Sequence, residues 1–76
     1  MTHDCRYLAR RLETVTREGG LLHVNIHPAS DMWMRGGTRG IITAVGRKWV
    51  SVRVYSAGKP VRHTPYKFSP NLLELA

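Results

Sequence analysis

Cysteine is nearly absent from this sequence, since Cys5 is the only one among 76 residues. No intramolecular disulfide can therefore form, and a lone thiol in so short a chain is typical of a reducing, intracellular setting. No apolar run approaches the roughly 18 residues of a membrane span, and the first residues lack the apolar stretch of a signal peptide. We therefore expect a soluble, cytoplasmic protein that does not bind membranes.

Acidic residues are also few, with five Asp and Glu against 12 Lys and Arg, which gives a net charge of +7. Paired carboxylates for acid–base catalysis are nearly absent, because three of the five fall in a predicted helix. The glycine-rich run 35–40 lacks the lysine and the following helix of a phosphate-binding loop. Cys5 falls on an apolar stripe, as buried structural cysteines do. We expect no enzymatic activity and no small-molecule substrate.

The four histidines, His3, His23, His27 and His63, do not have the spacing of metal ligands. His23 and His27 would lie about 13 Å apart along an extended strand. Cys5 with His3 has no second pair of ligands to complete a tetrahedral site. The sequence therefore predicts no metal site and no cofactor.

The N-terminal segment has the pattern of an amphipathic helix over about residues 3–18. Cys5, Leu8, Leu12 and Val15 follow one another at steps of three or four residues and form one apolar stripe. Thr2 can cap this helix, and Asp4 suits the positive end of its dipole. Gly19 and Gly20 then end it.

The rest of the chain, about 21–76, alternates as short strands do. Leu22, Val24 and Ile26 point to one side of the first strand, and Val50, Val52 and Val54 to one side of a later one. The predicted strands are 21–27, 38–45, 48–55 and 61–68. A loop over 28–37 follows the first strand, a tight turn at Gly46–Arg47 joins the second to the third, and Pro65 is expected at an edge or bulge of the fourth. A 3₁₀-like C-terminal turn then returns Leu72, Leu73 and Leu75 to the core. One domain over 1–76 is expected, because a chain this short buries only about 60% of its unfolded surface.

These elements predict an α+β fold, with the N-terminal helix packed on a small, strongly bent antiparallel sheet or partly open barrel of four to five strands. The run from Gly36 to Val45, with Trp49–Val52, resembles the KOW pattern of SH3-like barrels. Gly40 matches the central glycine of that pattern, Ile42 and Val45 its apolar positions, and Val50 and Val52 its returning strand.

The resemblance covers about residues 36–55 and implies a small barrel that binds RNA or other proteins, as in ribosomal proteins and transcription-elongation factors. The chain departs from the pattern in its very short Gly46–Arg47 turn and in its helix where the family has a first barrel strand. In size and charge it is also similar to small accessory proteins encoded by phages or mobile elements.

Positive charge is concentrated in the β-rich half. Eight basic residues, and no acidic one, lie between positions 35 and 67: Arg35, Arg39, Arg47, Lys48, Arg53, Lys59, Arg62 and Lys67. Ordinary protein surfaces mix both signs to limit self-repulsion. This segment is therefore predicted to form an anion-binding face.

Aromatic residues are interleaved with these cations, which suits nucleic acid because cations contact phosphates while rings stack on bases. The predicted binding residues are the eight cations with Trp49, Tyr55 and Tyr66. RNA or single-stranded DNA is the favoured partner. The alternative is that Trp49 and Tyr55 are buried under the N-terminal helix as a second core, with the valines facing the barrel interior.

A second function fits the same charge: a protein-binding inhibitor or adaptor that docks on an acidic host protein or nucleoprotein, such as a defence or transcription complex. Met32, Trp33 and Met34 would be its apolar anchors. These three either form an exposed contact patch or fold back to close the core. A homodimer through an edge strand, formed by 23–27, is also possible.

Overall fold

The computed structural model describes residues 4–56, 58–62 and 64–76, and over these residues the chain forms one α-helix, two 3₁₀ helices and six strands. The order is α1 (Cys5–Arg17), β1 (His23–Ile26), η1 (Asp31–Arg35), β2 (Arg39–Val45), β3 (Val50–Ser56), β4 (Lys59–Pro60), β5 (Tyr66–Phe68), η2 (Pro70–Leu72) and β6 (Leu73–Leu75). The strands form one antiparallel sheet in the order β4-β3-β2-β1-β6, with β5 also paired to β3. The predicted α+β class is confirmed, and the sheet is not closed.

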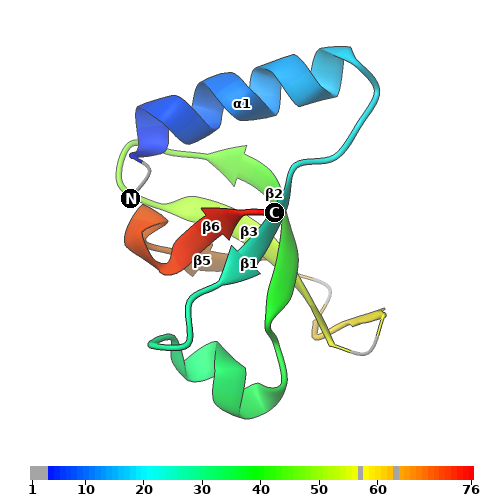
Figure 1. The fold of residues 1–76 in the computed structure, drawn as a ribbon, viewed down its shortest axis with the longest axis vertical. Coiled ribbons are helices and arrows are strands. Elements are labelled where there is room, and N and C mark those ends of the chain that lie inside the picture. Colours follow the sequence, from blue (N-terminus) through cyan, green and yellow to red (C-terminus); the bar gives the residue numbers. More distant parts are fainter. Residues whose placement is uncertain (1–3, 57, 63) are drawn as a thin grey trace.

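Helix α1 lies across one end of the sheet, and η1 occupies the opposite end (Figure 1). Its predicted apolar stripe is confirmed, since Leu8 is fully buried while Cys5, Leu12 and Val15 pack against the same core. Gly19 ends the helix in the left-handed conformation, with φ of 76°. No helix in the described part of the chain is long and apolar enough to cross a membrane.

Asp4 is the N-cap of α1, and its carboxylate accepts a hydrogen bond of 2.7 Å from the Tyr7 backbone N–H. Thr2, the cap expected from the sequence, lies outside the described residues. The carboxylate accepts from an N–H group that has no carbonyl partner within the helix, and it also lies at the positive end of the helix dipole. The stability of α1 therefore depends on Asp4 more than its exposure suggests.

Replacing Asp4 with Ala is expected to lower the free energy of unfolding by about 1 kcal/mol, because the Tyr7 N–H loses its partner. Asp4→Asn keeps an oxygen in the capping position and should differ from the wild type by only a few tenths of a kcal/mol. Urea unfolding followed by circular dichroism separates the two. Equal losses for Ala and Asn would mean that charge, rather than capping, is what Asp4 contributes.

The predicted alternation along β1 is confirmed. Leu22, Val24 and Ile26 are buried, whereas His23 and Asn25 are exposed. β1 pairs with β2 on one side and with β6 on the other, so residues 23–27 are not the free edge through which a second copy was expected to pair. The C-terminal segment supplies that neighbour, because η2 leads directly into β6.

The hairpin of β2 and β3 differs in detail from the prediction. Strand β3 begins at Val50 rather than at Lys48. The Gly46 N–H donates to the carbonyl oxygen of Trp49 at 2.8 Å, so the tight turn is centred on Arg47 and Lys48 instead of on Gly46 and Arg47. The register also shifts between Ile42 and Ala44, a bulge in β2. Lys48 and Trp49 therefore lie in the turn and not on the strand.

The strand predicted over 61–68 is mostly irregular, and only Tyr66–Phe68 of it is strand β5. β4 and β5 pair with the two ends of β3, on the same edge. Pro60 and Pro65 have no N–H to donate, which explains why one continuous strand does not form there. Pro65, which was predicted at an edge or bulge of that strand, lies outside the strands and directly precedes β5. With the unpredicted β6, the sheet reaches six strands rather than four or five.

The loop 28–37 contains η1, and its three apolar residues differ in how far they are buried. Ser30 caps η1 through a hydrogen bond from the Met32 backbone N–H to its hydroxyl. Met32 is buried in the core, so it is not available as the apolar anchor that the sequence suggested. Trp33 is 41% exposed and its indole N–H donates to the Ile26 carbonyl, whereas Met34 is 91% exposed. Both predicted outcomes, core closure and exposed patch, therefore occur within one turn of helix.

Candidate nucleic-acid interface

The two faces of β3 have different environments. Val50, Val52 and Val54 are fully buried and share one core with Leu8 of α1. The residues between them, Ser51, Arg53 and Tyr55, are half-buried or exposed on the other side, which we call the outer face. The alternative in which Trp49 and Tyr55 form a second core under the helix is therefore wrong: the helix packs with the valines, Trp49 is 54% exposed, and Tyr55 is half-buried.

The strand register brings three cations together on this outer face. Arg39 of β2 lies opposite Tyr55, and Lys67 of β5 lies opposite Ser51. Arg53 of β3 is diagonal to both of them, which corresponds to roughly 7–8 Å between neighbours. We call Arg39, Arg53 and Lys67 the cationic trio. All three side chains are exposed.

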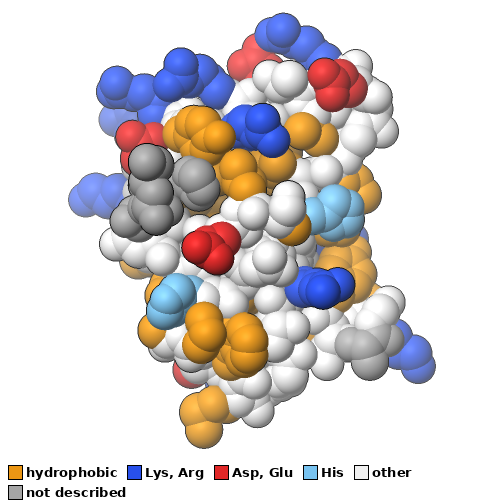
Figure 2. Space-filling model, in the orientation of Figure 1, with side chains coloured by type: hydrophobic (Ala, Val, Ile, Leu, Met, Phe, Trp, Pro, Cys, Tyr) orange, Lys and Arg blue, Asp and Glu red, His pale blue; other side chains and the backbone are white. Residues whose placement is uncertain are grey.

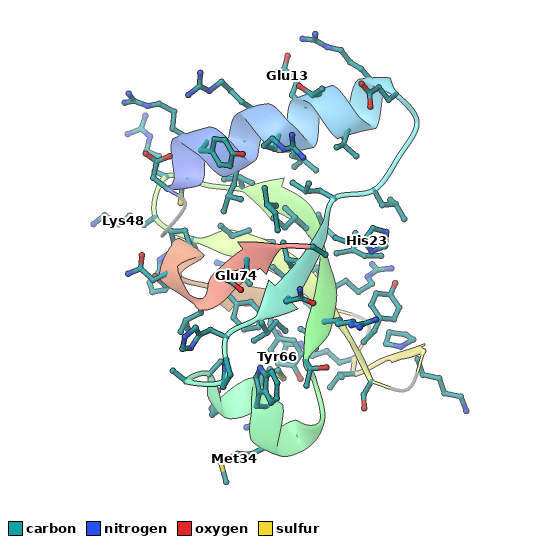
Figure 3. The ribbon with its side chains drawn as sticks, in the orientation of Figure 1. Glu13, His23, Met34, Lys48, Tyr66 and Glu74 are labelled. Atoms are coloured by element: carbon teal, nitrogen blue, oxygen red, sulfur yellow. The ribbon has the colours of Figure 1, made fainter. Side chains whose placement is uncertain are left out.

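Carboxylates are scarce around the trio. Within the described ranges, the only ion pair joins Arg17 to Glu13 at 2.5 Å, on the surface of α1. Glu74 is exposed on β6 opposite Asn25, which in turn lies opposite Arg39, so two strand steps separate the carboxylate from the trio. Figure 3 shows Glu74 on the face formed by β1 and β6. None of the three cations forms an ion pair within the described ranges, and all three side chains are exposed to solvent.

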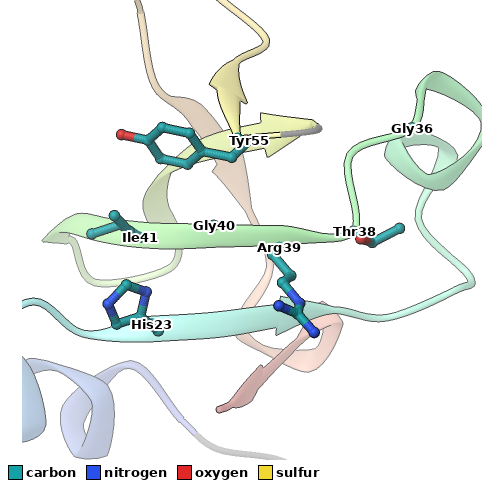
Figure 4. Close-up of a pocket in the computed structure, with 8 residues that line it drawn as sticks. His23, Gly36, Thr38, Arg39, Gly40, Ile41 and Tyr55 are labelled. Carbon is teal, nitrogen blue, oxygen red and sulfur yellow. The ribbon is translucent and has the colours of Figure 1, made fainter.

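A shallow hollow of about 470 Å³ lies beside the trio, where β1, β2 and β3 meet the loop after β3; we call it the Tyr55 hollow. Figure 4 shows Ile41 between the Tyr55 ring and the His23 ring, while the Arg39 side chain extends toward β1. Its lining residues are His23, Gly36, Thr38, Arg39, Gly40, Ile41, Tyr55 and Gly58. Sequence reasoning treated His23 only as an exposed polar residue. The missing information was the pairing of His23 with Ile41.

A second hollow, of about 260 Å³, is lined by β5 and by the exposed Trp49, and we call it the Trp49 hollow. Arg35 of η1, Trp49 and Tyr66 line it with Lys67, so Lys67 belongs both to the trio and to this hollow. Asp31 lines it too. Arg35, Trp49, Tyr66 and Lys67 come from three separate segments, and the fold brings these four predicted residues together.

Other predicted binding residues lie elsewhere. Arg47 and Lys48 are in the β2–β3 turn, which passes beside the N-terminal end of α1 (Figure 1). Lys48 and His23 lie on opposite sides of the molecule (Figure 3). Lys59 is exposed on β4 at the far end of β3. In Figure 2 the blue side chains gather over α1, whereas hydrophobic ones gather over η1. The charge predicted as one face is therefore divided among several sites.

Arg62 is engaged within the protein rather than directed at a partner. Its guanidinium donates to the carbonyl oxygens of Thr64 and Pro65, at 2.7 and 3.0 Å, and lies 3.7 Å from the centre of the Tyr66 ring. A planar fork that holds two carbonyls and stacks on a ring is a geometry that lysine cannot reproduce. We therefore assign Arg62 to holding the segment between β4 and β5.

Replacing Arg62 with Lys, which keeps the charge, is expected to lower the free energy of unfolding by about 1–2 kcal/mol through the lost hydrogen bonds and ring contact. Thermal unfolding measures this change. Binding to an anionic partner should stay within about twofold, as expected for an exposed site that keeps its charge. Unchanged stability together with weakened binding would place Arg62 in the interface after all.

The described residues contain no group of three or more His, Cys, Asp or Glu side chains that could hold a metal ion. His3 and His63 lie outside the residues described. The arrangement offers cations and aromatic rings on an open surface, and these groups can bind anions and stack on flat rings. No protein-family model, no curated protein and no solved structure gives a significant match to this chain.

Proposed function

We propose that this chain is a non-enzymatic nucleic-acid-binding module that holds a single strand of RNA or DNA on the outer face of β2, β3 and β5. The observation that carries the proposal is the cationic trio, which three neighbouring strands bring together and none of whose members forms an ion pair among the described residues. Phosphate contacts supply most of the affinity for nucleic acid when a surface has this character.

The aromatic residues favour a single strand over a duplex. Two rings have a cation as their neighbour: the half-buried Tyr55 lies opposite Arg39, and the exposed Trp49 shares a hollow with Lys67. Arg53 lies between the two pairs. Rings next to cations match the alternation of bases and phosphates along a strand, and the rings can stack only on bases that are not already paired. Trp49 and Tyr55 are six residues apart, about 20 Å along an extended chain, which leaves room for several nucleotides.

We also propose that the fold is related to the SH3-like barrels with a KOW segment. β2 and β3 form a hairpin through a short turn, and Gly40 and Val52 occupy the buried side where the resemblance expects them. The chain then returns so that the last strand pairs with the first. This order of strands is compatible with such a small β fold.

A salt series tests the function. Fluorescently labelled single-stranded RNA, single-stranded DNA and duplex DNA are titrated with the full chain between about 50 and 200 mM salt. We expect the single strands to bind more tightly than the duplex, with an affinity that falls steeply as salt rises. An absence of binding at the lowest salt, or an affinity that ignores salt, would exclude the proposal.

Met34 favours a second candidate, the protein-binding inhibitor or adaptor. Its side chain is 91% exposed and that of the preceding Trp33 is 41% exposed. Both lie on η1, which also carries Arg35, and an anchor for an acidic protein surface combines apolar and basic side chains in this way. A pull-down from nuclease-treated lysate separates the two functions. A stoichiometric protein that is lost with Met34→Ser, and not with Leu21→Ser at an exposed apolar position outside η1, supports the second function. Loss of all partners after nuclease supports the first.

A further inference from the structure

The Tyr55 hollow has features that an ordinary solvated strand surface lacks. Three strands build it, and its floor is Ile41, which is only half-buried. His23 pairs with Ile41 and Tyr55 pairs with Arg39, so the two rings lie two strands apart and are offset by two residues along the strands. With about 4.8 Å between strands and about 3.3 Å per residue, their side chains start roughly 12 Å from each other. This width admits a flat ring system.

Three glycines line the hollow. Gly36 and Gly58 line it with φ of 82° and 79°, a conformation that other residues rarely adopt. Gly40 also lines it, and a Cβ there would point inward at Val52 rather than into the hollow. Only five of the eight lining residues carry a side chain, and the volume of about 470 Å³ falls within the range of small-molecule sites.

The chemistry of the remaining walls points to one kind of ligand. Tyr55 offers a ring face, His23 offers a ring with one donor and one acceptor nitrogen when neutral, and Arg39 offers a fork for an anion. None of the described carboxylates lines the hollow. These groups match the parts of a nucleotide. The aromatic ring suits the face of a base, the polar histidine suits the edge of the base, and the arginine suits the phosphate.

We propose that the Tyr55 hollow is a subsite for one unstacked nucleotide, with its base between Tyr55 and His23 over Ile41 and its phosphate on Arg39. This inference rests on the proposed function, and it extends that function by naming the unit that is recognised. It implies a preference for strands with a free end or a bulged nucleotide, because such a nucleotide reaches the hollow without unpairing.

Nuclear magnetic resonance titrations with a nucleoside 5′-monophosphate, the free nucleoside and inorganic phosphate test the subsite. We expect the monophosphate to shift the amide signals of His23, Gly40, Ile41 and Tyr55, and to bind about tenfold more tightly than either half alone. Tyr55→Leu should weaken it about tenfold by removing the stacking surface, and Arg39→Gln should weaken it similarly.

Tyr55→Phe, which keeps the ring, and Arg10→Gln, which removes one exposed charge from α1, are the matched controls and should bind as the wild type does. If Tyr55→Leu does not fold, Arg39→Gln and His23→Asn on exposed strand positions carry the test. Shifts elsewhere, or equal binding of monophosphate and phosphate, would overturn the subsite. A single-stranded oligonucleotide titrated in parallel separates the two proposals, since it would still bind through Arg53 and Lys67 if only the subsite were wrong.

Discussion

Replacing Arg39, Arg53 and Lys67 together by glutamine is expected to weaken the binding of single-stranded RNA about 10- to 100-fold at low salt. The estimate takes roughly 0.5–1 kcal/mol for each exposed cation–phosphate contact. The dependence of log affinity on log salt should also become shallower by about 2, since each phosphate contact on a single strand contributes about 0.7. Fluorescence anisotropy in a salt series measures both quantities.

Helix α1 supplies a control with the same change in charge. Arg6, Arg10 and Arg11 are exposed on α1, and Arg6→Gln/Arg10→Gln/Arg11→Gln also removes three positive charges. We expect this variant to lose no more than about threefold in affinity, the part that comes from the long-range field of the protein. Equal losses in the two triple variants would show that net charge governs binding and that the outer face has no special role.

Replacing Gly40 with Ala is expected to lower the free energy of unfolding by about 2–3 kcal/mol, through overpacking. Gly40 is buried in β2, and a Cβ there would collide with Cγ1 of Val52 and lie 2.9 Å from the carbonyl oxygen of Arg53. The carbonyl belongs to a paired strand and cannot move aside without breaking the sheet. For a domain of this size the loss corresponds to about 10–20 °C in the melting temperature.

Gly46→Ala is the matched control for this substitution. It lies in the adjoining turn, and its added Cβ would meet only the Trp49 carbonyl oxygen, at 3.3 Å. Its cost should stay below about 1 kcal/mol, the usual range for a tolerated surface change. If Gly40→Ala melts at the wild-type temperature, then β2 and β3 do not approach each other as closely as the structure shows.

Short-range patterns account for the parts of the fold that the sequence predicted correctly. The stripe of α1 and the alternation of β1 and β3 depend only on which side of an element is buried, and that information repeats every two to four residues. The 3₁₀ turn before the C-terminus follows from Ser69–Pro70 in the same way. Such local signals need no knowledge of strand partners.

Pairing between distant segments could not be predicted in this way. β6 is three residues long and forms only because Leu73 and Leu75 meet the buried side of β1. The pairing of β5 with Val50–Val52, rather than with β4, depends on where the irregular segment after Pro60 directs the chain. Strands β5 and β6 are each only three residues long, which is too short for an alternating pattern to be recognised in the sequence.

The candidate site shows the same division. The acid-free run from Arg35 to Lys67 was visible in the sequence, and it contains the whole trio. The register decided which of its members meet, since it placed Arg39, Arg53 and Lys67 on one face and left Lys48 beside α1. The sequence predicted Arg62 as an interface residue and did not indicate its bonds to Thr64 and Pro65, because these bonds exist only in the folded loop.

The most direct test of the central claim is a map of the bound surface. Amide and side-chain signals of the full chain are followed by nuclear magnetic resonance while a short single-stranded RNA is added at low salt. The outer-face account predicts that the largest shifts occur at Arg39, Arg53, Tyr55 and Lys67 and at the indole of Trp49, while signals of α1 stay in place. Shifts concentrated on α1, or on Trp33 and Met34, would contradict it.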